Sequence, residues 1–118
     1  MNPIYYIADG LGGWRTTNDI HEWGNWFGSP DIMRPFSEGG KVVAKTRLPD
    51  GVEVSTVFLG MDHGFGYGAG DPILFETMIF GGPQDQYQER YCTFQEAQQG
   101  HAEAVQLAQS QEPVKGYE

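Results

Sequence analysis

The sequence predicts a single α+β domain: an antiparallel sheet of about four to six strands, with a short N-terminal helix and a C-terminal helix packed on the sheet. Three observations predict this class. Two apolar runs meet at the turn Pro49-Asp50-Gly51, a capped amphipathic pattern begins at Thr93, and a chain of 118 residues can bury one core. We place the domain at residues 1–109 and expect residues 110–118 to form a flexible tail.

The N-terminal elements are a strand and a short helix. Residues 4–8 form an apolar and aromatic run followed by glycines, which is typical of a strand that ends in a turn. Asp19 is placed to cap a helix over residues 20–27. The apolar residues that recur at helical spacing on one face of it are Ile20, Trp23 and Phe27. Residues 29–40 contain prolines and glycines, so we expect an irregular connection there.

The middle of the chain predicts a hairpin and two further strands. Residues 41–48 and 52–60 are the arms of the hairpin, and the second arm is apolar on both faces at its far end. We therefore expect this arm to be a central strand. Residues 73–80 are mostly apolar and predict another largely buried strand, and residues 87–92 are expected to return antiparallel beside it.

The last element is predicted to be a helix. Thr93 and Glu96 have the spacing of a capping box. Gly100 in the middle of the helix costs about 1 kcal/mol relative to alanine, which indicates a close approach between helix and strand. The face that we expect to pack on the sheet consists of Phe94, Ala97, His101, Ala104, Val105 and Ala108.

Composition excludes several classes of protein. Cys92 is the single cysteine, so an internal disulfide or a multi-cysteine metal site cannot form, and we expect a buried, inert thiol. A net charge of −9 disfavours direct nucleic-acid binding. The first residues lack the pattern of a secretion signal and no stretch has membrane-spanning length, so we expect a cytoplasmic protein that does not bind a membrane.

Residues 62–71 are the segment that we expect to carry function. This glycine-rich loop connects two predicted central strands, and loops at such positions often hold binding sites. Gly64 and Gly66 could donate backbone amides to a phosphate or carboxylate, while Phe65 or Tyr67 stacks on a base. The alternative is a wide crossover without a ligand, because the loop lacks the spacing of a phosphate-binding fingerprint.

Polar side chains elsewhere could complete such a site. Arg47 and Arg90 are candidates for phosphate contacts, and His63 or Glu76 for polar orientation of the ligand. Glu76 could instead form a structural ion pair with an arginine, which would offset the cost of burying its carboxylate. His101 is either a core imidazole bonded to a backbone carbonyl or a ligand group that reaches the loop.

Catalytic and metal-binding patterns are missing from the sequence. His21 and Glu22 do not begin a His-Glu-x-x-His motif, and no serine has the flanking glycines of a hydrolase elbow. The histidines and carboxylates have no spacing that supports a metal site. We therefore expect no enzyme activity, no bound metal and no cofactor.

Three segments resemble a family of small phage and prophage accessory proteins to which no role is usually assigned. These segments are VSTVFLGMDH at residues 54–63, LFETMIFGG at residues 74–82 and EAQQGH at residues 96–101. The resemblance spans about half of the chain and implies a phage accessory protein in the cytoplasm of a host bacterium. A sheet followed by a closing helix is also similar in architecture to the phage sponges for cyclic ADP-ribose signals of Thoeris anti-defence.

Two functions follow from this resemblance and from the residues. The first is a non-enzymatic counter-defence protein that sequesters a small nucleotide-type immune signal, as a homo-oligomer, since so small a domain rarely encloses a ligand alone. The second is an inhibitor of the anti-CRISPR kind, whose acidic surface occludes a basic surface of a host nuclease or effector. The glycine-rich loop favours the first function, and the net charge favours the second.

Overall fold

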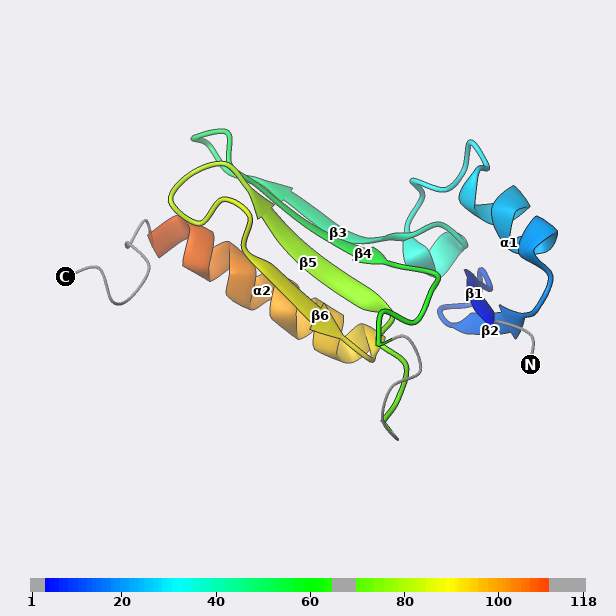
Figure 1. Cartoon of the computed structure of the whole chain (residues 1–118). Coiled ribbons are helices and arrows are strands. Elements are labelled where there is room, and N and C mark those ends of the chain that lie inside the picture. Colours follow the sequence, from blue (N-terminus) through cyan, green and yellow to red (C-terminus); the bar gives the residue numbers. More distant parts are fainter. Residues whose placement is uncertain (1–3, 65–69, 111–118) are drawn as a thin grey trace.

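The structure is a computed structural model that describes residues 4–64 and 70–110. Within these residues the chain forms six strands, two α-helices and one 3₁₀ helix, named here as in Figure 1. In order they are β1 (Tyr5–Ala8), β2 (Trp14–Thr17), α1 (Ile20–Phe27), η1 (Phe36–Glu38), β3 (Val42–Arg47), β4 (Glu53–Phe58), β5 (Phe75–Phe80), β6 (Gln88–Tyr91) and α2 (Phe94–Ser110). The predicted α+β class is confirmed, including a short N-terminal helix and a C-terminal helix that packs on a sheet.

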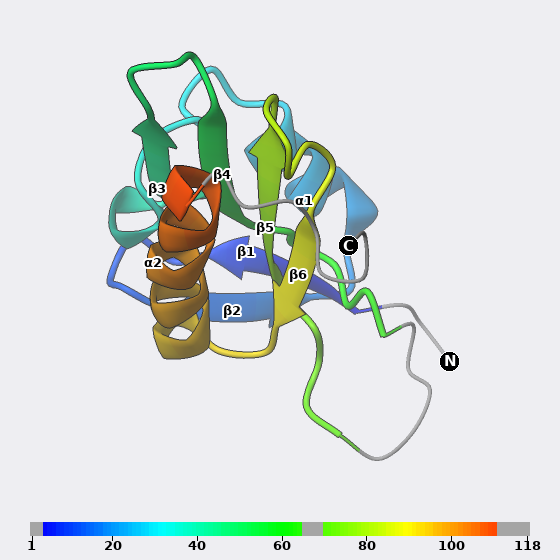
Figure 2. The same cartoon turned by 90° about the vertical axis from the view of Figure 1, so that its left-hand side faces the viewer.

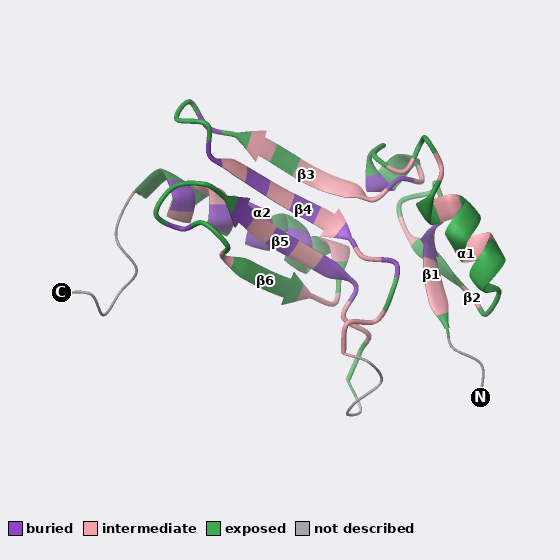
Figure 3. Ribbon diagram, turned by 45° about the horizontal axis from the view of Figure 1, so that its top comes forward, coloured by how far each residue is buried: buried purple, intermediate pink, exposed green. Residues whose placement is uncertain are grey.

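The main sheet is an antiparallel meander in the order β3-β4-β5-β6. The turn between β3 and β4 closes as predicted, with Gly51 at φ +89°, where glycine avoids the strain that a side chain would cause. The prediction that β4 is central is confirmed, because it pairs with β3 and β5. The prediction that β4 is buried on both faces is wrong. Buried and half-buried residues alternate along it, because α2 covers one face only (Figure 3).

Helix α2 lies along one face of the main sheet and forms a second layer there (Figures 1 and 2). Its predicted capping box is present: the Glu96 amide donates to Thr93 Oγ1 over 3.0 Å, and the Thr93 amide donates to Glu96 Oε1 over 3.1 Å. The close approach predicted at Gly100 is also present, because a side chain there would overlap the ring of Tyr91 on β6. The residues of α2 that are buried against the sheet are Ala97, Gly100, His101, Ala104 and Ala108.

The N-terminal lobe, which consists of β1, β2 and α1, lies at one end of the main sheet (Figure 1). Strand β2 was not predicted, and it forms a separate two-stranded sheet with β1. Asp19 caps α1 as predicted, accepting from the His21 and Glu22 amides. The expected apolar face of α1 does not make a core, since no residue of the helix is buried and Ile20 is 54% exposed.

One glycine joins the N-terminal lobe to the main sheet. The Gly60 carbonyl, just beyond β4, accepts from the Tyr6 amide and from Trp23 Nε1, each over 3.0 Å. A side chain at Gly60 would meet Trp23 Nε1 at 2.9 Å, and φ is +75° there. The lobe is thus held by hydrogen bonds to a backbone carbonyl that only glycine can present in this way.

An aromatic cluster fills the space between the lobe, the sheet and α2. Phe36 of η1 is 1% exposed, which makes the connection at residues 29–40 less irregular than predicted. Its ring stacks on Phe94 at 5.3 Å between centroids and contacts the rings of Phe58 and Phe75.

Residues 111–118, most of the predicted tail, lie outside the described part of the chain.

Candidate functional site

The base of the glycine-rich loop is pinned by hydrogen bonds. The Asp62 carboxylate accepts from the amides of Gly64 over 2.8 Å and Ile73 over 2.9 Å, and the His63 amide donates to the Ile73 carbonyl over 2.9 Å. Asp62 therefore closes the loop where it leaves and re-enters the sheet. Three predicted ligand residues, Phe65, Gly66 and Tyr67, lie outside the described residues.

A half-open hollow of about 230 Å³ lies at this loop base, between α1 and the end of β4. We call it the ring pocket. It is lined by Trp23, Phe27, Lys41, Val57, Phe58, Leu59, Met61 and His63. His63 is thus the one predicted ligand residue among the residues that line this pocket, and it lies directly before Gly64.

Aromatic ring faces and a cation meet in the ring pocket. The rings of Trp23 and Phe27 stack at 4.9 Å between centroids and 20° between planes. Lys41 Nζ lies 5.3 Å from the centroid of the Phe27 ring, so the ammonium is held beside an aromatic wall. Phe27 and Met61 are about 40% exposed, which leaves apolar surface open to a ligand. Such a pocket suits a flat ring that carries an anionic group.

Glu76 and Arg90 pair with each other on the main sheet. Arg90 Nε lies 2.9 Å from Glu76 Oε2, and Gln88 Nε2 donates to the same oxygen over 2.6 Å. The Glu76 side chain is only 13% exposed, so these two donors offset the cost of burying its charge. The structure gives this pair the geometry of the structural ion pair that we weighed against a ligand role.

His101 belongs to α2 and is buried against the face of the sheet opposite Glu76. Its Nδ1 is 2.8 Å from Thr56 Oγ1 and its Nε2 is 2.9 Å from Thr46 Oγ1. Thr56 Oγ1 is also 2.5 Å from Thr77 Oγ1. His101 is therefore a core imidazole, although its partners are threonine hydroxyls and not the backbone carbonyl that we expected. Burial lowers the pKa of His101, because it disfavours the charged imidazolium.

The predicted ligand residues that the structure describes do not converge on one site. Arg47 lies at the hairpin end of β3 opposite Glu53, whereas the ring pocket lies past the other end of β4. Of the predicted ligand residues within residues 4–64 and 70–110, only His63 and Gly64 are brought to the loop base. Sequence reasoning missed Trp23, Phe27, Lys41 and Met61. The spacing of Trp23 and Phe27 on one face of a helix is visible in the sequence, but it does not show that this face borders a pocket.

Cys92 and the acidic groups give no sign of reactive chemistry. Burial raises the pKa of the Cys92 thiol, and the carboxylates of Glu96, Asp71 and Asp62 raise it further. Across residues 4–64 and 70–110, no three His, Cys, Asp or Glu side chains group closely enough to hold a metal ion. The same residues contain no helix that is both long and apolar enough to cross a membrane.

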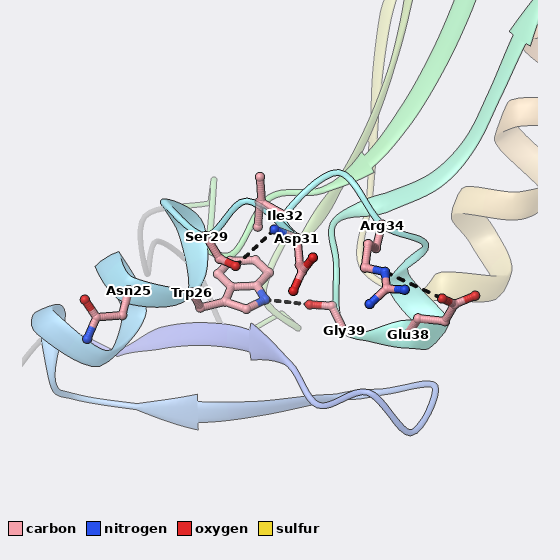
Figure 4. A pocket seen from close by; sticks show the side chains of 8 residues that line it. All are labelled: Asn25, Trp26, Ser29, Asp31, Ile32, Arg34, Glu38 and Gly39. Atoms are coloured by element: carbon pink, nitrogen blue, oxygen red, sulfur yellow. Dashed lines mark hydrogen bonds and ion pairs between the residues drawn. The ribbon is translucent and has the colours of Figure 1, made fainter.

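A second hollow, of about 360 Å³, lies between α1 and η1 (Figure 4). Five of its eight lining residues have polar side chains, and some of the polar groups around it already have partners. Trp26 Nε1 donates to the Gly39 carbonyl over 2.7 Å, and Arg34 lies 3.9 Å from Glu38. The residues around it are Asn25, Trp26, Ser29, Asp31, Ile32, Arg34, Glu38 and Gly39. We regard it as a weaker candidate, because the indole N–H of Trp26 and the Arg34 guanidinium are already engaged by Gly39 and Glu38, as Figure 4 shows.

No protein-family model, no curated protein and no solved structure matches this chain. The resemblance to phage accessory proteins therefore stays an expectation from the three sequence segments. The function has to be inferred from the residues of the ring pocket and from the surfaces around it.

Proposed function

We propose that the protein is a non-enzymatic binding protein that captures a small nucleotide-type molecule in the ring pocket. In the phage setting that the sequence implies, the ligand is a cyclic ADP-ribose-like signal of host immunity. The observation that carries the proposal is the meeting of the exposed Phe27 ring, stacked on the half-buried Trp23, with Lys41 and His63 at the base of the glycine-rich loop. Trp23 covers one face of the Phe27 ring, so a base stacks on the face over which the Lys41 ammonium now lies, and the displaced lysine balances phosphate charge.

The size of the ring pocket limits what it holds. About 230 Å³ is less than the roughly 300–1,000 Å³ of a typical ligand pocket. We therefore expect one base and a neighbouring phosphate to be enclosed, with the remainder of the ligand at the surface. Binding supplied mainly by one stacked ring and one cation is modest, so the affinity depends strongly on Phe27 and Lys41.

The first test measures thermal stabilisation by a panel of cyclic nucleotides and ADP-ribose derivatives. A ligand at a hundred times its Kd adds about 2.7 kcal/mol to the free energy of unfolding, which is readily detected. Phe27→Ala is expected to weaken binding about 5- to 150-fold, the value of one stacked base. Lys41→Met is expected to weaken the binding of phosphorylated ligands more than the binding of nucleosides.

Two controls separate the ring pocket from general effects. Lys45→Met removes an exposed lysine on β3 that pairs with Glu53, away from the ring pocket, and should leave ligand affinity unchanged. Calorimetric titration gives the affinities of all variants. The proposal is abandoned if no ligand of the panel shifts the melting temperature, or if the affinity is the same in Phe27→Ala as in the parent protein.

A second candidate function, occlusion of a basic host protein, is favoured by the placement of acidic residues near β6 and α2. Glu89 and Glu103 are exposed. Burial raises the pKa values of the Tyr87 and Tyr91 hydroxyls, and the charges of these two carboxylates raise them further. This function requires association with a purified basic nuclease that weakens as salt rises. Association that is unchanged in Glu89→Lys and Glu103→Lys variants would exclude this surface.

A further inference from the structure

The face of the main sheet opposite α2 has no layer over it in the described structure (Figure 3). We call it the open face. The strand register assigns its residues, because directly paired residues of antiparallel strands point to the same side. They are Val42, Lys45 and Arg47 of β3, Glu53, Ser55 and Val57 of β4, Glu76, Met78 and Phe80 of β5, and Gln88 and Arg90 of β6.

An apolar row crosses the centre of the open face, flanked by the polar Glu76 opposite Val57 and Ser55 opposite Met78, and this row is incompletely buried. Val57 and Met78 lie on the two central strands and are half-buried, and Phe80 at the end of β5 is 42% exposed. Their neighbour Ser55 is small and uncharged. A sheet of this kind is stable when a second layer covers such a surface, as in a sandwich of two sheets about 10 Å apart.

The charge of the open face differs from that of the whole molecule. The protein has 16 acidic and 7 basic residues, yet the open face holds three basic side chains against two carboxylates. Both carboxylates are paired there: Glu53 with Lys45 at 3.8 Å and Glu76 with Arg90 at 2.9 Å. The open face is therefore close to neutral on a protein of net charge −9.

We infer that the open face is the contact surface for a second copy of this chain, which packs on it face to face. Two copies with a charge of −9 each repel one another, so they can meet only where the local surface is not acidic. A contact of this kind is isologous, so the apolar row of one copy meets the same row of the other copy. A basic partner, by contrast, would select an acidic surface.

The dimensions of the open face predict a weak dimer. Three strands of six residues and one of four, about 4.8 Å apart and at about 3.3 Å per residue, span roughly 350 Å². Stable interfaces bury about 800 Å² on each partner. We therefore expect a reversible dimer that forms as the protein concentration rises. This inference does not depend on a ligand, although Val57 belongs to both surfaces, so a second copy would also add a wall beside the ring pocket.

Sedimentation velocity over a concentration series tests the inference on the full chain. We expect a monomer at low concentration, a dimer at high concentration, and tighter association when added salt screens the mutual repulsion of the acidic chains. Met78→Glu puts two like charges into the apolar centre of the contact and should raise the dimer Kd about tenfold or more. Gln106→Glu makes the same change of charge on an exposed position of α2 and should leave the Kd nearly unchanged.

Circular dichroism and a thermal melt establish that each variant is folded. If Met78→Glu does not fold, Ser55→Glu adds the charge at the adjacent, already polar position of the open face. A protein that stays monomeric at every concentration overturns the inference. So does a dimer with the same Kd in the parent protein, in the open-face variant and in Gln106→Glu, because such a dimer uses another surface.

Discussion

Replacing His101 by leucine tests the polar layer between α2 and the main sheet. His101, Thr56 and Thr77 form a row of hydrogen-bonded side chains, and all three residues are buried. This row separates two apolar clusters, one around Phe58 and Phe75 and the other around Val54 and Ile79. Leucine keeps the apolar volume of the position but removes both ring nitrogens.

The expected loss can be worked from the contacts. Two hydrogen bonds of 2.8 Å and 2.9 Å disappear, each with a net value of about 1 kcal/mol. The buried Thr56 hydroxyl keeps only its bond to Thr77, which adds part of a desolvation penalty, while the leucine side chain returns some apolar burial. We expect His101→Leu to lower the free energy of unfolding by roughly 2–3 kcal/mol, or the melting temperature by about 10 °C.

The pH dependence gives a second measure of the same residue. Burial lowers the pKa of His101, so the unfolded chain binds the proton more readily than the folded chain. The stabilising effect of the neutral imidazole is complete above the unfolded pKa of about 6.5 and decreases as pH falls below it toward the folded value. The slope is at most about 1.4 kcal/mol per pH unit. His101→Leu should remove this component.

Urea unfolding of the parent protein and of the variant, at pH values on both sides of that pKa, measures both effects. His21→Leu is the matched control, since His21 is exposed on α1. A second variant that also carries Thr56→Val and Thr77→Val should recover part of the loss, because neither hydroxyl of the buried Thr56–Thr77 pair is then left without its partner. The reasoning is refuted if His101→Leu keeps the parent stability to within about half a kcal/mol and keeps the same pH slope.

Three further substitutions test the joints of the fold. Gly60→Ala forces a side chain toward Trp23 at a positive φ, so we expect a loss of about 2 kcal/mol or more in urea unfolding and a change in tryptophan fluorescence. Gly100→Ala would gain about 1 kcal/mol in an isolated helix. In this protein it should lower the melting temperature, because the new methyl group overlaps the ring of Tyr91. Thr93→Ala should cost about 1 kcal/mol of stability through loss of the α2 cap, whereas Thr93→Ser should restore most of it.

The local signals in the sequence predicted the elements that depend on neighbouring residues. The hairpin turn at Gly51, the Asp19 cap and the Thr93–Glu96 capping box each involve residues within a few positions of one another, so their backbone requirements are visible in the sequence. The close approach at Gly100 was also predicted, because a glycine inside a helix is costly and its presence indicates that a neighbouring element needs the space.

The partners of the polar side chains were less predictable. Glu76 was expected to need an arginine, and the structure chose Arg90 because β6 pairs with β5 in the register that places them opposite one another. The sequence left His101 as either a core imidazole or a ligand group, and its bonds to threonines of β3 and β4 follow from how α2 lies across the sheet. A shift of one residue would turn these side chains to the other face.

The sequence by itself determined the fold class, the order of the main strands and the ends of both helices, because caps, turns and periodicity are local. The tertiary structure alone decided which side chains share a site. It brought Trp23 and Phe27 from α1 to Lys41 and His63 at the end of the main sheet, and it left Arg47 and His101 elsewhere. The physical reason is that this meeting depends on a backbone contact at Gly60, whose partners lie far from it in the sequence.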